Sequence, residues 1–142
     1  MHRKNPAEIG FGARIAREDK KRLEAVLQMN GGKTWWMIKS LEFFVEACEA
    51  SAELQGWVHD EILRLKEEEP AIGPIEFQPT IPRALYDRFT RMFPERGANT
   101  WFIRNAVKEY LKVTEELPTH EDMVNIAVQR VLHPEAGTDG TR

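Results

Sequence analysis

The sequence repeats itself at an offset of 66 residues, and this repeat constrains the fold more than any other feature. The identical pairs, without any gap, are Ile9/Ile75, Phe11/Phe77, Ile15/Ile81, Arg17/Arg83, Arg22/Arg88, Gly31/Gly97, Thr34/Thr100, Trp35/Trp101 and Glu49/Glu115. These are nine identities between residues 9–49 and 75–115, where average composition would give about two or three by chance. One unit therefore occurs twice along the chain.

Each unit opens with a segment in which apolar residues alternate with other residues. The apolar positions are Phe11, Ala13 and Ile15 in the first unit, and Phe77, Pro79 and Ile81 in the second. The intervening positions are Gly10, Gly12 and Arg14, and then Glu76, Gln78 and Thr80. This period of two predicts a half-buried strand in each unit. Because Pro79 has no N–H to donate, we expect its nitrogen to face away from the partner strand.

Two helices are expected after each strand, because apolar residues recur there at helical spacing. Gly31-Gly32 and Gly97 are expected to end the first helix of each unit. Thr34 and Thr100 are expected to cap the second helix. The pattern in each unit is therefore strand, helix, helix.

A third helix is expected to close each unit. In the first unit it runs roughly from Ala52 to Glu68, with apolar residues at helical spacing. In the second unit, Thr119 and Asp122 resemble a capping box ahead of a helix that includes Met123.

The need to pair backbone groups and to bury apolar side chains predicts how the two units combine. A strand flanked only by helices leaves its backbone groups without partners, and neither unit is long enough to bury a secure core alone. We therefore expect a mainly α fold in which two repeats form one pseudo-twofold body around a two-stranded antiparallel ribbon. The expected boundaries are a flexible arm at 1–8, repeats at 9–69 and 75–132, a linker at 70–74 and a disordered tail at 133–142.

Composition narrows the classes of function. The net charge of −3 argues weakly against nucleic acid, but slightly basic blocks at 1–50 and 75–117 alternate with acidic ones. Cys48 is the only cysteine, which favours a cytoplasmic, reducing setting. The scattered histidines indicate no metal or other cofactor. The apolar runs are too short to span a membrane. The sequence contains no nucleophile–base pair or paired acid site of the kind expected in an enzyme.

The order strand, helix, helix, with Gly-x-x-Thr before the second helix, resembles the ribbon-helix-helix family of Arc and MetJ type repressors. The stretch from Asn99 to Leu111 is similar to the family's second-helix signature, a small hydroxyl residue followed by a pattern of the kind E-F-I-R-x-A-x-x-x-Y-L. The stretch from Phe77 to Arg83 resembles its strand-to-helix junction. The resemblance covers about residues 9–49 and 75–115, and it implies a tandem ribbon-helix-helix protein in the cytoplasm of a bacterial, archaeal or phage-infected cell. The third helices lie outside the family's minimal fold.

Carried over residue by residue, the resemblance implies that outward side chains of the ribbon read base edges in the DNA major groove. The reading positions are Gly10, Gly12, Arg14, Glu76, Gln78 and Thr80. The N-termini of the second helices would anchor phosphates through free N–H groups and the helix dipole. The anchoring residues are Lys33, Thr34 and Trp35 in the first unit, and Asn99, Thr100 and Trp101 in the second.

Several of these positions depart from the family pattern. Two of the reading positions are glycine, and Glu76 would be repelled by phosphate, although a carboxylate can accept a hydrogen bond from cytosine. Trp35 and Trp101 recur where the family usually has a polar residue. Two interpretations of these tryptophans remain open, which are contact with a partner protein and packing against a third helix.

The leading hypothesis is sequence-specific binding of double-stranded DNA by a small transcriptional regulator or repressor without catalysis, with self-association on DNA left open. The alternative is a protein-interaction module on the same frame that has lost DNA reading. Such a module would be a phage-type or plasmid-type factor, or an antitoxin-like protein.

Overall fold

The computed structural model describes residues 7–29, 32–68, 75–116 and 123–134. Within these ranges the chain is mainly helical, and its short strands pair two by two in antiparallel fashion. The elements are β1 (Glu8–Gly10), β2 (Ala13–Ile15), α1 (Arg17–Met29), α2 (Gly32–Glu49), α3 (Ala52–Glu68), β3 (Ile75–Phe77), β4 (Thr80–Pro82), α4 (Arg83–Met92), α5 (Ala98–Glu116) and α6 (Met123–Leu132). The expected mainly α class and the antiparallel strand pairing are confirmed.

The strand pairs β1–β4 and β2–β3 follow a single register. Ile9 lies opposite Ile81 in the first pair, and Ala13 lies opposite Phe77 in the second. Between them, the N–H of Phe11 donates to the C=O of Pro79 over 2.8 Å. In such an antiparallel pair both residues normally exchange hydrogen bonds, and Pro79 lacks the N–H for the return bond. We therefore treat residues 8–15 and 75–82 as one ribbon with a missing hydrogen bond at its centre.

This geometry corrects the expectation for Pro79. The C=O of Pro79 accepts from the partner strand, and the N and O atoms of one strand residue point to the same side. The nitrogen of Pro79 therefore faces the partner strand rather than away from it. The ring is buried, which keeps the interrupted position out of water.

The bounds of one helix agree with the expectation from the sequence, whereas the expected roles of the glycines and threonines at the helix ends do not. The third helix of the first half, α3, spans Ala52–Glu68 as expected, and its first turn is capped by Ser51, whose Oγ accepts from the N–H of Leu54. Gly32 and Gly97 have φ values of +87° and +98°, but they lie at the start of α2 and just before α5. Thr34 and Thr100 lie inside the first turns of these helices and are not their caps.

Some expectations fall on residues outside the described ranges. They are the role of Gly31, the capping box at Thr119 and Asp122, the linker at 70–74, and most of the arm and tail. At the edge of the arm, Glu8 already belongs to β1. None of the helices in the described ranges is long and apolar enough to cross a membrane.

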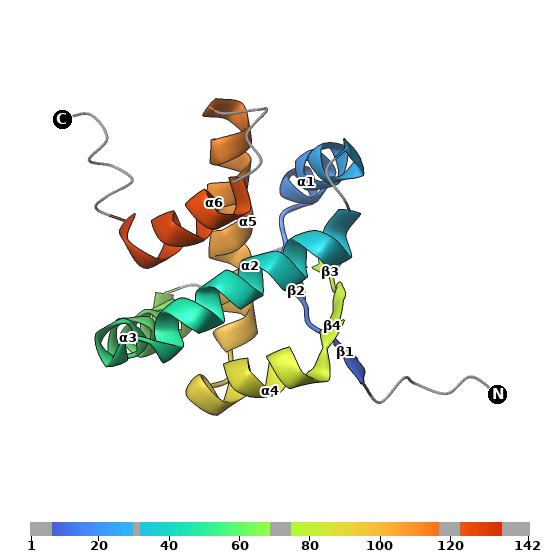
Figure 1. The fold of residues 1–142 in the computed structure, drawn as a ribbon. Coiled ribbons are helices and arrows are strands. Elements are labelled where there is room, and N and C mark those ends of the chain that lie inside the picture. Colours follow the sequence, from blue (N-terminus) through green and yellow to red (C-terminus); the bar gives the residue numbers. More distant parts are fainter. Residues whose placement is uncertain (1–6, 30–31, 69–74, 117–122, 135–142) are drawn as a thin grey trace.

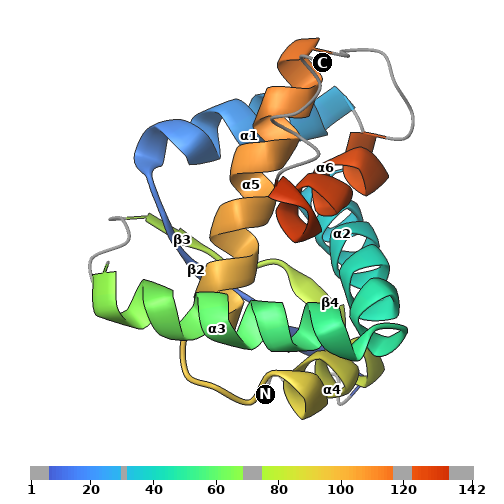
Figure 2. The ribbon, with the colours of Figure 1, turned by 90° about the vertical axis from the view of Figure 1, so that its left-hand side faces the viewer.

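The elements form a helical body with the ribbon on one side. Figures 1 and 2 show α2 and α5 crossing at the centre, the ribbon on one side of them, and α3 and α6 on the other. Helices α1 and α4 lie at opposite ends of the ribbon. The core contains Cys48, whose pKa is raised to about 12 by burial and by the charge of Glu49.

Contacts between the two halves occur in reciprocal pairs. The rings of Trp36 and Tyr110 are 5.6 Å apart, and the positions equivalent to them through the repeat, Phe102 and Phe44, are 4.8 Å apart. The same holds for Phe11–Phe102 at 6.2 Å and Phe77–Trp36 at 6.1 Å. Reciprocity of this kind is typical of interfaces between symmetry-related subunits. At these aromatic positions, each half therefore contacts the other through equivalent residues.

Candidate functional site

The outward positions of the ribbon form one exposed surface, which we call the outer ribbon face. It consists of Gly10, Gly12, Arg14, Glu76, Gln78 and Thr80. The side chains of Arg14, Glu76, Gln78 and Thr80 are exposed, whereas the inward residues Phe11, Ile15, Phe77, Pro79 and Ile81 are buried. All the residues expected to read bases are thus brought together on one surface.

At the centre of the outer ribbon face, the side chain of one glutamine lies over two glycines. The register places Gly12 opposite Gln78. A Cβ on Gly12 would be 2.6 Å from the C=O oxygen of Phe77, and a Cβ on Gly10 would be 2.6 Å from Nε2 of Gln78. The side chain of Gln78 therefore lies across the glycine strand. Gly12 is therefore required for close approach of the two strands, whereas Gly10 leaves room for the end of the Gln78 side chain.

Charges on the outer ribbon face are mixed. Arg14 lies directly opposite Glu76 in the ladder, so a cation and an anion share one end of the face. Two further arginines, Arg17 and Arg83, are exposed where the chain leaves the strands and enters α1 and α4. These two residues were not among those expected from the sequence to contact DNA. Their identity in the repeat was the signal that could have identified them, because they occupy equivalent positions at the two ends of the ribbon.

The two expected phosphate anchors are not equivalent. At the start of α2, Lys33 and Thr34 are exposed, and no acidic residue lies in the first turn. At the start of α5, Asn99 and Thr100 are only half-exposed. The first turn of α2 is therefore the more accessible of the two helix N-termini.

Trp35 and Trp101, identical in the repeat, have different surroundings. Trp35 is 38% exposed, whereas Trp101 is 4% exposed. The ring of Trp101 packs edge-on against Trp57 of α3, with the centroids 6.1 Å apart, and it also contacts Phe44. The expectation that Trp101 contacts a partner protein is wrong, because α3 covers this end of α5. Trp101 therefore packs against a third helix, whereas Trp35 keeps an exposed surface.

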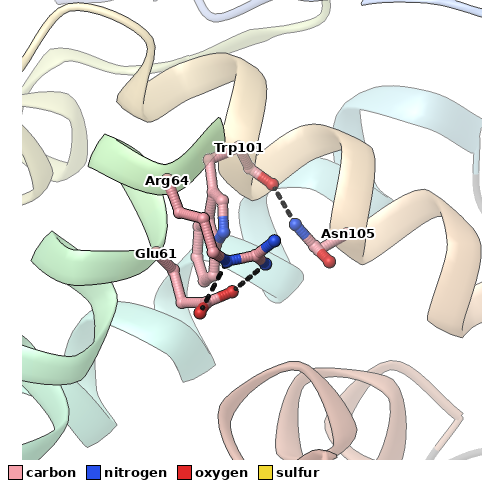
Figure 3. Close-up of polar contacts among 4 residues, drawn as sticks. All are labelled: Glu61, Arg64, Trp101 and Asn105. Atoms are coloured by element: carbon pink, nitrogen blue, oxygen red, sulfur yellow. Dashed lines mark hydrogen bonds and ion pairs between the residues drawn. The ribbon is translucent and has the colours of Figure 1, made fainter. Parts of the chain in front are cut away.

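Polar contacts around Trp101 lie within α5 and within α3, and one further contact joins α3 to the loop before α5. The side-chain amide of Asn105 donates to the C=O of Trp101 over 2.8 Å. On α3, Arg64 donates to Glu61 at 2.7 Å, and Figure 3 shows this ion pair beside the indole ring. One helical turn away, His59 of α3 bonds to Glu95 in the loop before α5. The contact between His59 and Glu95 and the packing of Trp57 on Trp101 therefore join α3 to the start of α5.

The outer ribbon face has the chemistry of a binding surface. It presents an arginine, an amide, a hydroxyl and a carboxylate, which are groups that can hydrogen-bond to base edges or to another protein. Within residues 7–29, 32–68, 75–116 and 123–134, no group of three or more His, Cys, Asp or Glu residues is placed to hold a metal ion.

Comparison with known proteins assigns no family to this chain. A scan against protein-family models, a search of curated proteins and a search of solved structures found no match.

Proposed function

We propose that this protein is a tandem ribbon-helix-helix protein that binds double-stranded DNA through the outer ribbon face, as a small transcriptional regulator. The observation that carries the proposal is that equivalent strands of the two halves pair in antiparallel register with their expected reading positions exposed on one face. A two-stranded ribbon has the width to enter the major groove. Ribbon readers of this kind place side chains from both strands on base edges.

The repeat and the register support a pseudo-twofold relation between the halves. The offset of 66 carries Gly12 onto Gln78, and these are the residues that the register places opposite each other. We place the pseudo-twofold axis between them. The reciprocal aromatic contacts of the core follow the same relation. The two strands would then present different side chains to the two halves of a DNA site, which predicts an operator that is only roughly palindromic.

Each exposed side chain has a defined preference for base edges. Arg14 suits the O6 and N7 acceptors of guanine, and Gln78 suits the N6 and N7 groups of adenine. Glu76 could accept a hydrogen bond from N4 of cytosine. Thr80 can donate or accept. Gly12 contributes by leaving room for the side chain of Gln78.

Phosphate contacts would surround these readers. Lys33 and Thr34 lie in the exposed first turn of α2, where free N–H groups and the helix dipole favour an anion. Arg17 and Arg83 lie at the two ends of the ribbon, where they could contact the backbone on either side of the groove. Such contacts position the protein, whereas the outer ribbon face specifies the sequence.

Selection of bound sequences from random duplex DNA, at low and at physiological salt, tests this function. We expect an enriched motif whose affinity falls with salt by about 0.9 in log K per log unit for each phosphate contacted. Arg14→Ala should cost about 1–3 kcal/mol at one base position. The matched control is Arg91→Ala, an exposed arginine in the last turn of α4. Absence of a motif, or equal losses for both variants, would contradict DNA reading by the ribbon.

A second candidate function is protein binding on the same frame. It is favoured by the 38% exposure of Trp35 and by the net charge of −3. Trp35 lies next to Lys33 and Thr34, so a protein partner and DNA phosphate would compete for the same helix end. Association with a partner that depends on Trp35 and changes little with salt would favour this alternative.

A further inference from the structure

A cavity of about 450 Å³ lies between α1 and α5. Its polar lining comprises Asp19 and Arg22 from α1, and Arg104, Lys108, Lys112 and Glu115 from α5. Ile15, Val107 and Leu111 contribute its apolar part. Because Ile15 points inward from the ribbon, the cavity lies on the inner side of β2 and not on the outer ribbon face. Its size is in the range of small-molecule binding sites.

The cavity has an excess of positive charge that the protein does not neutralise. Arg22 pairs with Glu115, and Lys112 lies 3.6 Å from Glu109. In the part of the chain that the structure describes, neither Arg104 nor Lys108 forms an ion pair. Arg104 is nevertheless half-buried. A partly desolvated cation without a counter-charge is unfavourable, and an anion in the cavity would supply that charge.

The other half of the molecule lacks this arrangement at its equivalent positions. The repeat places Glu42 and Glu46 at the positions of Lys108 and Lys112. It places Leu85, which is buried, at the position of Asp19. The basic cavity is therefore a property of the α1–α5 side and not a consequence of the fold itself. Lys108 and Lys112 lie one turn apart on the same face of α5, in line with Arg104.

We propose that this cavity binds a small phosphorylated molecule, with Arg104 and Lys108 contacting the phosphoryl oxygens. The planar guanidinium of Arg104 can donate two parallel hydrogen bonds to a phosphoryl group, and Lys108 adds a mobile ammonium at the mouth. The apolar residues on the cavity wall suit a non-ionic part of the ligand. This site does not depend on the proposed DNA binding.

Titration of the isotope-labelled full chain with sodium pyrophosphate, followed by amide NMR at constant ionic strength, tests the proposal. We expect saturable shifts of amides in residues 15–22 and 104–115. Arg104→Gln should weaken binding about tenfold or more, because a charge-assisted hydrogen bond is lost, and Lys108→Gln should weaken it less. The control variant is Lys39→Gln, an exposed lysine on α2 outside the cavity.

Four results would overturn the proposal. The first is the absence of saturable shifts at millimolar pyrophosphate, and the second is equal binding by Arg104→Gln and the parent chain. A tighter response to citrate than to pyrophosphate would exclude phosphoryl selectivity. Duplex DNA shifting the same amides, with affinity sensitive to Arg104, would assign the cavity to nucleic acid. If circular dichroism shows that Arg104→Gln does not fold, the binding of pyrophosphate by Lys108→Gln tests the proposal instead, since Lys108 is exposed.

Discussion

Arg88 of α4 and Glu49 of α2 form a two-point ion pair between the halves of the chain, with Nε and Nη2 of the guanidinium 3.0 and 2.7 Å from the two carboxylate oxygens. Their equivalents in the repeat, Arg22 of α1 and Glu115 of α5, pair in the reverse direction. All four residues are among the identities that define the repeat. The two ion pairs thus join the halves reciprocally, as the aromatic core contacts do.

The Arg88–Glu49 pair predicts a pH dependence of stability. The hydrogen bond from Arg88, and then its charge and that of Arg91, hold the pKa of Glu49 below its ordinary value of 4.5. A lowered folded-state pKa adds stability above pH 4.5, and this stability is lost as the pH falls through the lowered value. Arg88→Ala should therefore cost about 0.2–1 kcal/mol at neutral pH, as exposed pairs do. Urea unfolding at several pH values should show the difference from the parent chain shrinking below pH 4.5.

Three glycine-to-alanine variants should have different effects on stability. Gly12→Ala should cost about 1–3 kcal/mol, because its Cβ meets backbone that cannot move aside. Gly10→Ala should cost less, since its Cβ meets only the flexible end of Gln78. Gly56→Ala, inside α3 with nothing within 4 Å, should stabilise by about 1 kcal/mol through helix propensity. Thermal and urea unfolding measure all three, and a stable Gly12→Ala would disprove the tight strand contact.

The two equivalent tryptophans should respond differently to replacement. Trp101→Ala should destabilise the protein by about 3–5 kcal/mol, since it empties a buried site. Trp35→Ala should change the free energy of unfolding by no more than about 0.5 kcal/mol. Iodide quenching of fluorescence provides a second readout, because loss of the exposed Trp35 should lower the quenchable signal more than loss of the buried Trp101. Similar losses of stability in both variants would contradict the burial of Trp101 under α3.

Neither half should fold alone as a monomer. The chain 1–69 exposes Phe44 and Trp36, whose ring partners lie in the other half, and its strands lose their hydrogen-bond partners. We expect the isolated halves to be unfolded or self-associated, and mixing 1–69 with 75–142 to restore helicity. Circular dichroism and size-exclusion chromatography measure this. A folded monomeric half would disprove the interdependence.

Local periodicity in the sequence predicted individual elements. The alternation around Phe11 and Phe77 predicted the strands, and apolar spacing predicted a helix from about Ala52 to Glu68. The gathering of Arg14, Gln78 and Thr80 on one face also followed, because side chains in a strand alternate between its two sides. These features depend on residues close together in the chain, and the repeat then supplied the partner strand.

Only the tertiary structure determined what distinguishes the two halves. Trp35 and Trp101 are identical residues in equivalent positions, so no local rule separates them, and burial follows from where α3 packs. The direction of the Pro79 nitrogen depends on the register with Phe11, which alternation alone leaves undetermined. The cavity at Arg104 requires α1 and α5 to meet, although they are distant in the chain. Sequence periodicity determines which face of an element is buried, whereas packing between distant elements determines which of two equivalent surfaces stays open.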